Sequence, residues 1–224
     1  MSWIYLSHIL EESTPLYGGK GKIEIARVRS ISSGDTSNNS DLSMSAHSGT
    51  HVDAPFHFDQ EGKKLDEYPA DYWFASKPAM ITFSASPGMI IRMEHLEEKL
   101  QQIPKATDLL LLKSGAEEWR HNQKDAYCEQ GVGLGTDVSN WIRCNLNLKF
   151  IGLDFISVAS PMHREEGRAT HKSLLSKTPY KSEPVLIIED MTLANLTNVP
   201  ESVWVVPFRY FAADGAMVTV LARV

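Results

Sequence analysis

Cysteine is scarce in this sequence, with only Cys128 and Cys144 among its 224 residues. Two cysteines at that spacing supply neither a disulfide framework nor a thiolate zinc knuckle. No stretch reaches the roughly 18 apolar residues of a membrane-spanning helix. The first residues lack a basic segment and a small-residue cleavage site, so no signal peptide is expected. These absences predict a protein of a reducing compartment, which we take to be the cytoplasm.

Basic runs are also missing, and the formal net charge is −6. Nucleic acids and anionic membranes attract clustered Lys and Arg, so neither is an expected partner. The motif Gly-x-Ser-x-Gly is absent, which disfavours a serine hydrolase of that type. A helix-borne His-Glu-x-x-His protease motif is absent as well. The 42% hydrophobic and 22% charged residues are typical of a globular protein, and we expect residues 1–224 to form one domain.

Strands outnumber helices in the expected secondary structure. Alternating or short apolar runs predict the strands 4–9, 23–31, 79–84, 108–113, 150–155, 185–188, 204–206 and 217–224. Amphipathic patterns predict helices over 93–102 and 137–145, the second capped by Thr136. The polar tract Ser32–Ser43 predicts a loop. The pattern indicates an α/β protein with a mixed, mostly β core and a few flanking helices.

Three of the eight histidines lie within one short segment, His47-Ser-Gly-Thr-His51-Val-Asp53-Ala-Pro-Phe-His57. Imidazole nitrogen and carboxylate oxygen are the ligands of catalytic divalent ions, whose sites keep one position open. These four residues are separated from one another by even numbers of positions, so in an extended chain their side chains point to the same side. The segment therefore predicts an open metal site. The alternative is that these are solvent-facing or core-bonded histidines of a loop.

This segment resembles the His-x-Gly-Thr-His-x-Asp-x-Pro-x-His motif of the cyclase family of metal-dependent hydrolases, which includes bacterial kynurenine formamidase and isatin hydrolase. Further similar segments are Leu109–Gly115, Gly133-Leu134, Ile151–Ser157, His171 with Leu174-Leu175, Ile187–Glu189 and Asp214-Gly215-Ala216. The resemblance thus covers nearly the whole chain. It implies a swivelling β/β/α fold for a single cyclase-like domain.

The resemblance also implies a set of site residues. His47, His51 and Asp53 would bind a metal, His171 and Glu189 would complete a second metal position, and His57 would be the acid/base residue. The implied cofactor is zinc or manganese, as one or two ions. His163 lies in a charged stretch, so we expect it to be exposed. Homodimers or higher homo-oligomers are implied as well.

The function implied by the resemblance is hydrolysis of a small amide by a metal-activated water, as in the conversion of N-formylkynurenine to kynurenine and formate. Alternatives are cleavage of an isatin-type lactam, hydrolysis of a lactone or ester, and a non-catalytic binding module stabilised by metal. Nearby aromatic residues would either line a pocket for an aryl substrate or pack in the core: Phe56, Phe58, Tyr72, Trp73 and Phe74. Two departures from the family, an insertion at 177–184 and Tyr17-Gly18-Gly19 in place of a Pro-Gly pair, predict a different pocket.

Overall fold

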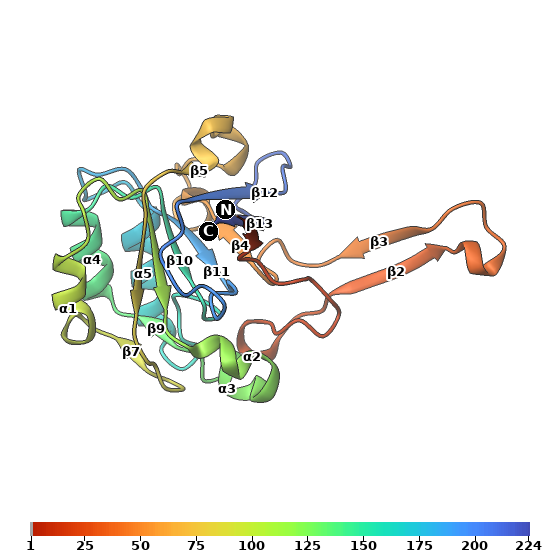
Figure 1. Cartoon of the computed structure of the whole chain (residues 1–224), viewed down its shortest axis with the longest axis horizontal. Coiled ribbons are helices and arrows are strands. Elements are labelled where there is room, and N and C mark those ends of the chain that lie inside the picture. The colour runs from red at the N-terminus through yellow and green to blue at the C-terminus, as the bar shows by residue number, and fades with distance from the viewer. Residues whose placement is uncertain (1) are drawn as a thin grey trace.

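The computed structural model describes residues 2–224 as a mixed nine-stranded sheet with the longer helices on one side (Figure 1). In spatial order the strands are β5 (Phe74–Ala75), β12 (Ser202–Pro207), β13 (Gly215–Arg223), β4 (His51–Asp53), β11 (Leu186–Glu189), β10 (Phe150–Leu153), β8 (Leu109–Lys113) and β6 (Pro78–Thr82), and β1 (Trp3–Tyr5) also pairs with β13. Strands β6, β8, β10 and β11 are parallel to one another, whereas the remaining pairs are antiparallel. The predicted mixed, mostly β core is confirmed.

Both faces of the parallel strands are buried. Leu110 and Leu112 of β8 pack in a cluster with α1 (Met93–Gln101), α4 (Thr136–Asn145) and α5 (Arg164–Leu175). Leu109 and Leu111 face the other way and pack with residues of β12 and β13. The sheet must therefore curve, because strands several positions apart in it share this second cluster. Continuous burial explains why β8, β10 and β11 appear in the sequence as unbroken apolar runs.

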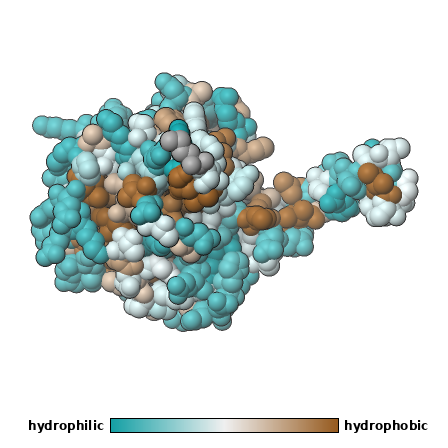
Figure 2. Space-filling view, in the orientation of Figure 1, coloured by the Kyte–Doolittle hydropathy of each residue, from teal (hydrophilic) through white to brown (hydrophobic). Residues whose placement is uncertain are grey.

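A two-stranded hairpin projects from this body (Figure 1). It consists of β2 (Glu24–Arg29) and β3 (Asn39–Ser43), which pair antiparallel. The expected loop over Ser32–Ser43 is therefore wrong at its C-terminal end, since pairing with β2 overrides the weak strand preference of Asn, Ser and Asp. The prediction that residues 23–31 form a half-buried strand is also wrong for most of the segment, because most of these side chains are exposed. Val28 and Leu42 are exposed, and Figure 2 shows apolar side chains along this arm.

Helix α5 is absent from the sequence-based prediction, which took its first residues as a charged loop. Its buried positions include Gly167 and Thr170 beside Leu174 and Leu175, so its apolar periodicity is weak. Gly167 lets the helix approach the loop after β10, because an added Cβ would lie 2.3 Å from the Cβ of Ala159. His163 is exposed, as expected.

The smaller elements complete the body. Helices α2 (Trp119–Asn122) and α3 (Lys124–Cys128) follow β8, and β7 (Ile90–Ile91) pairs parallel with β9 (Gly133–Leu134). Helix α4 begins at Thr136 with Gly135 as its N-cap, so Thr136 is the first helical residue and not the predicted cap. Among residues 2–224, no helix combines the length and apolar character needed to cross a bilayer.

Candidate metal centre

Strands β4 and β11 bring three of the expected ligands onto one face of the sheet. His51 and Asp53 are two residues apart in β4, and Glu189 of β11 pairs directly opposite His51. Residues two apart in a strand, and residues paired across two strands, point to the same face. The intervening Val52 packs in the opposite core cluster. Strand register therefore gathers two carboxylates and one imidazole on the helix-covered side.

Helix α5 adds His171 to this face. Its Nε2 lies 3.6 Å from Asp53 Oδ2 and 3.6 Å from Glu189 Oε1. The His51 Nε2 lies 3.5 Å from Asp53 Oδ1 and 3.4 Å from Glu189 Oε2. All four side chains are buried. The predicted ligands from three distant segments of the chain thus converge.

These separations fit a shared divalent ion better than direct hydrogen bonds. A nitrogen–oxygen hydrogen bond is typically about 2.7–3.2 Å long. Four ligand atoms that each lie about 2.0–2.2 Å from a tetrahedral ion are about 3.3–3.6 Å from one another. The distances from His51 and His171 to Asp53 and Glu189 fall in that second range. His51 and His171 reach different oxygens of each carboxylate, so the residues present match the donor types and pairwise separations of metal ligands without forming one set of four ligand atoms.

Backbone carbonyls orient both imidazoles. The Nδ1 of His51 is 2.8 Å from the Gly49 carbonyl oxygen, and the Nδ1 of His171 is 2.8 Å from that of Gly167. A carbonyl oxygen only accepts, so each Nδ1 carries the proton and donates it. The Nε2 of each ring then faces the cluster. A hydrogen bond to the far nitrogen is how proteins commonly fix a metal-binding histidine.

His47 lies beside this group and shares Asp53 with it. Its Nδ1 is 2.8 Å from Asp53 Oδ1, and its Nε2 is 3.0 Å from Asp214 Oδ2. Gly215 pairs opposite Asp53, and the missing side chain makes room for the ring. An added Cβ there would lie 2.4 Å from His47 Cε1. Glycine at this position is therefore a requirement of the site.

His57 stacks on His47, with ring centroids 4.1 Å apart. Its Nδ1 lies 3.4 Å from Asp214 Oδ2, which places one carboxylate beside both rings. Two groups of donors have the spacing to hold an ion, His47 with Asp53 and His57, and His51 with Asp53 and Glu189. Asp53 belongs to both groups, so its carboxylate lies between two candidate metal positions.

Opposite charges compensate one another in this cluster. Burial would lower the pKa of His171, but its contacts with Asp53 and Glu189 raise that pKa to about 10. Burial would likewise lower the pKa of His47, yet Asp53 and Asp214 raise it to about 9. Burial and the charge of Asp53 would raise the pKa of Glu189, whereas the nearby imidazoles hold it at about 2. The buried carboxylates thus favour positive charge in this cluster, as they would beside a divalent ion.

A second buried network supports the ends of β4 and β11. Asp190 follows Glu189 in the left-handed region, with φ of 52°. Its carboxylate accepts two hydrogen bonds from the Arg120 guanidinium, at 2.9 and 3.0 Å, and one from the Tyr127 hydroxyl at 2.5 Å. The hydroxyl of Thr50, the residue before His51, donates to the Asp190 carbonyl oxygen. The network therefore holds the residue before His51 and the residue after Glu189 together.

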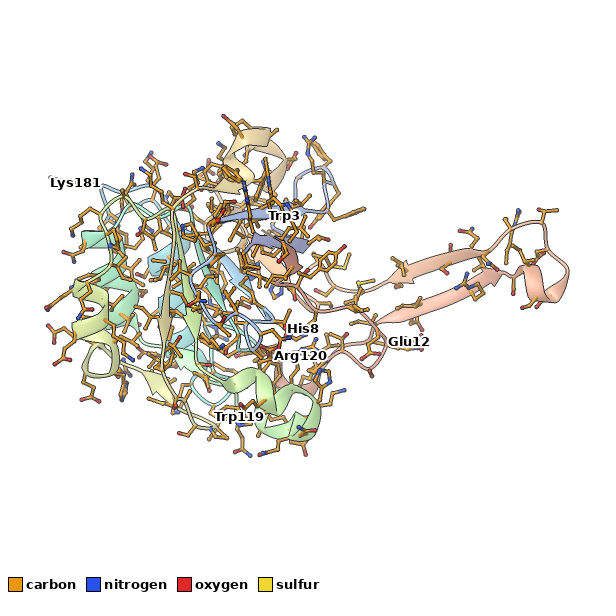
Figure 3. The ribbon with its side chains drawn as sticks, in the orientation of Figure 1. Trp3, His8, Glu12, Trp119, Arg120 and Lys181 are labelled. Carbon is orange, nitrogen blue, oxygen red and sulfur yellow. The ribbon has the colours of Figure 1, made fainter. Side chains whose placement is uncertain are left out.

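This network lies where α2 meets the N-terminal segment, and Figure 3 labels Arg120 and His8 there. The His8 amide donates to the hydroxyl of Thr50 at 2.9 Å. The N-terminal segment thus supports the strand that carries His51 and Asp53. Sequence analysis missed this network, because an isolated Arg or Asp carries no local signal of burial.

A cavity of about 510 Å³ opens above the donor cluster. Its lining includes the cluster itself and, among other residues, Tyr17, Gly18, Lys20, Phe58, Arg164 and Arg168. Of the aromatic residues expected near the site, Phe58 lines the cavity and stacks on His171 at 4.5 Å between centroids. Tyr72 and Trp73 instead pack on Phe150 in the second core cluster, and Phe74 packs on Trp204.

The two departures from the family motif have different positions. Tyr17 and Gly18 line the cavity, so this departure lies in the pocket wall. The 177–184 stretch contains Tyr180 and Ser182, which contact α4 through Asn140 and Arg143. No residue of 177–184 lines the cavity in the part of the chain that the structure describes. The insertion therefore does not itself form the wall of this cavity, and a pocket that differs from that of the family stays a prediction.

Fold and donor set together define a class, a small-molecule hydrolase with a site for divalent metal. A family model described as "putative cyclase" matches residues 4–160, and the chain belongs to the cyclase family. Among curated relatives, kynurenine formamidase of Bacillus cereus is 24% identical over 226 residues, covering 99% of this chain and 97% of the relative. Cyclase-like protein 1 of Arabidopsis thaliana is 28% identical over 204 residues, covering 88% and 74%.

Solved structures agree on the fold. Isatin hydrolase A from Labrenzia aggregata, bound to benzyl benzoate, superposes with a TM-score of 0.79 at 19% identity, covering 99% of this chain and 93% of its own. A potential metal-dependent hydrolase with cyclase activity superposes with a TM-score of 0.77 at 18% identity, covering 99% and 96%. The relatives with named activities are hydrolases, which supports a metal-dependent hydrolase as the general class.

Proposed function

We propose that this chain hydrolyses a small aryl amide, and that its reaction is the cleavage of N-formylkynurenine to kynurenine and formate. The observation that carries the proposal is the buried group His51, Asp53, His171 and Glu189, whose nitrogen and oxygen donors lie 3.4–3.6 Å apart at the floor of an open cavity. The nearly full-length similarity to a kynurenine formamidase supports the choice of substrate.

His47, His51, Asp53, His171 and Glu189 would hold the metal, as one ion or as two. When bound, such an ion lowers the pKa of water toward about 7 and polarises the carbonyl that is attacked. A set of imidazoles and carboxylates suits zinc or manganese.

His57 is the proposed acid/base residue. Burial lowers the pKa of His57, so the ring is neutral near pH 7 and accepts a proton from the attacking water. The water oxygen bonds to the formyl carbon, the carbon–nitrogen bond breaks, and His57 returns the proton to the leaving nitrogen. Asp214, 3.4 Å from Nδ1, orients the ring for both transfers. Phe58 forms an apolar wall that suits an aryl group.

Two further properties are proposed with this function. We expect a homodimer or higher homo-oligomer, with the projecting hairpin as a contact surface because Val28, Ile31 and Leu42 are exposed on it. Light scattering after gel filtration tests this, and a monomer at micromolar concentration would contradict it. A cytoplasmic location remains a prediction from the sequence.

The test of the function combines metal content and formate release on the same samples. The purified protein is resupplied with zinc or manganese, and His57→Gln is compared with His95→Gln, a histidine of α1 outside the cavity. We expect His57→Gln to keep its metal and to lose about 10²–10⁴-fold in kcat, while His95→Gln is unchanged. Metal loss in His57→Gln would instead make His57 a ligand.

Two other outcomes separate the alternatives. Metal binding without formate release, but with cleavage of isatin or an aryl ester, would favour the lactam or ester hydrolase. Metal binding without any hydrolysis would favour a metal-stabilised binding module. Absence of bound metal after resupply would contradict the whole proposal.

A further inference from the structure

Two arginines line the cavity without a partner. Arg164 and Arg168 are exposed residues of α5, four apart, so they lie on one face of the helix. Neither guanidinium makes a hydrogen bond or an ion pair with any residue of 2–224. By contrast, Arg92, Arg120 and Arg143 each bind a carboxylate or several carbonyl oxygens. Arg27, Arg29 and Arg209 also have no such contact within residues 2–224, but only Arg164 and Arg168 of these five line the cavity.

The acidic residues that line the cavity are buried, whereas the lysine and arginines that line it are exposed. The acidic lining residues are Asp53, Glu189 and Asp190, and all three are buried and compensated by imidazoles or by Arg120. The cationic lining residues other than histidine are Lys20, Arg164 and Arg168, and all three are exposed. A protein with a net charge of −6 thus carries a positive rim at the opening of this cavity. Such a rim attracts anions.

Arg164 also breaks a local rule of helix stability. It is the first residue of α5, where the helix dipole disfavours a cation by about 0.3–1 kcal/mol. The neighbouring Glu165 and Glu166 follow the rule. Burial raises the pKa of Tyr17, which also lines the cavity, and the charges of Arg164 and Arg168 oppose that rise, so both charges act on a lining residue. Residues that violate local preferences are expected at functional sites.

From these observations we propose that Arg164 and Arg168, together with Lys20, form a subsite for a carboxylate on the substrate. This proposal rests on the proposed function and specifies its substrate class, an aryl amide with an anionic group remote from the scissile carbonyl. A guanidinium matches a carboxylate through two parallel N–H···O bonds, which selects a planar anion over a neutral group.

The helix fixes the approximate position of that anion. At 1.5 Å of rise per residue, Arg168 stands about 5 Å and Arg164 about 10 Å along the axis from His171. The anion and the scissile carbonyl are therefore separated by roughly the length of an aryl ring with a short chain. A small neutral amide would occupy the floor of the cavity and leave the rim unused.

The test uses a matched pair of substrates, 4-(2-formamidophenyl)-4-oxobutanoate and neutral 2-formamidoacetophenone, which share the aryl formamide and differ in the carboxylate. Arg164→Gln and Arg168→Gln are compared with Arg168→Lys and with Arg27→Gln on the projecting hairpin. We expect each Gln variant to raise KM for the anionic substrate about 10-fold or more, with kcat and the neutral substrate changed less than about twofold. Arg168→Lys should recover part of the loss, and Arg27→Gln should behave as wild type.

A binding measurement separates this subsite from the proposed reaction. The corresponding amines, 4-(2-aminophenyl)-4-oxobutanoate and 2-aminoacetophenone, are titrated into the metal-resupplied protein by calorimetry. Tighter binding of the carboxylate that weakens about 10-fold in the Gln variants supports the subsite even if no formate is ever released. Equal binding of the two amines, no binding of either, or an unchanged carboxylate affinity in both Gln variants would overturn it.

Discussion

The floor and the rim of the cavity are built on different principles. At the floor, His51, Asp53, His171 and Glu189 are buried, and each imidazole has its far nitrogen fixed by a backbone carbonyl. At the rim, the cationic side chains are exposed and lack partners within the described chain. The floor is therefore preorganised by folding, whereas the side chains of the rim are available to bind a ligand. We therefore assign the proposed hydrolysis to the floor and the proposed selection of an anionic substrate to the rim.

The largest expected effect comes from breaking the floor at its shared ligand. Asp53→Asn keeps the volume of the side chain but removes the charge that faces both candidate metal positions. Changes to the partners of ligands already cost about 10–100-fold in affinity, so we expect metal affinity to fall by at least about 100-fold. Elemental analysis and a cobalt titration measure it, with the exposed Asp71→Asn as the control. Normal metal content in Asp53→Asn would show that the floor is not the metal site.

The next largest effect is expected in the buried network of Arg120, Tyr127 and Asp190. Substitutions there test whether this network supports the floor. Arg120→Gln leaves the Asp190 carboxylate buried without its cation, which costs about 3–5 kcal/mol. Tyr127→Phe removes one hydrogen bond and should cost about 1–3 kcal/mol. Urea unfolding measures both losses. We also expect Arg120→Gln to weaken metal binding about 10–100-fold, and an unchanged affinity in the folded variant would make the network purely structural.

A smaller effect concerns the protons that balance the floor when no metal is bound. The pKa of His47 is raised to about 9 and that of His171 to about 10, so their stabilisation is complete below 6.5 and is lost as the pH rises through those values. The pKa of Glu189 is lowered to about 2, so its stabilisation is present above 4.5 and is lost as the pH falls toward 2. Tm of the chelator-treated protein should therefore be highest between about pH 4.5 and 6.5. Metal resupply should remove the alkaline decline, and a flat metal-free profile from pH 6.5 to 10 would contradict this account.

The smallest effect is expected at the rim. Lys20→Gln and Arg168→Gln remove exposed charges without partners, so the free energy of unfolding should change by less than about 0.5 kcal/mol. Metal content should equal that of wild type. Urea unfolding and elemental analysis check both. A loss of stability above that limit would mean that the rim, like the floor, is held in place by the fold.

The two regions also differ in how far the sequence predicts them. The segment from His47 to His57 by itself predicts a metal site. Four donor residues whose side chains point to the same side of a short extended stretch are rarely there for packing alone. The paired ends of β4 and β11 could be anticipated in part, since Ile187–Glu189 is an apolar run that ends in a carboxylate. His171 was reached through family resemblance, whereas the helix that presents it was missed because its buried face consists largely of small and polar residues.

Other features left no signal along the chain. The alternating segment at 23–31 predicted a half-buried strand, yet nothing of this chain's core covers the hairpin, since periodicity reports a strand and not its neighbours. Asp214 and Gly215 matched the family motif, but their contacts with His47 and His57 arise only when β13 pairs beside β4. Arg120, Tyr127 and Asp190 come together across 63 to 70 residues of sequence.

The sequence by itself determined the element types of the core and the donor residues of the His47 to His57 segment, because side-chain periodicity and ligand chemistry are local properties. Tertiary structure decided which strand lies beside β4, how α5 approaches it, and which arginines face the cavity. Those choices depend on sheet register and on close packing at Gly167 and Gly215, where a missing Cβ allows segments far apart in the chain to meet.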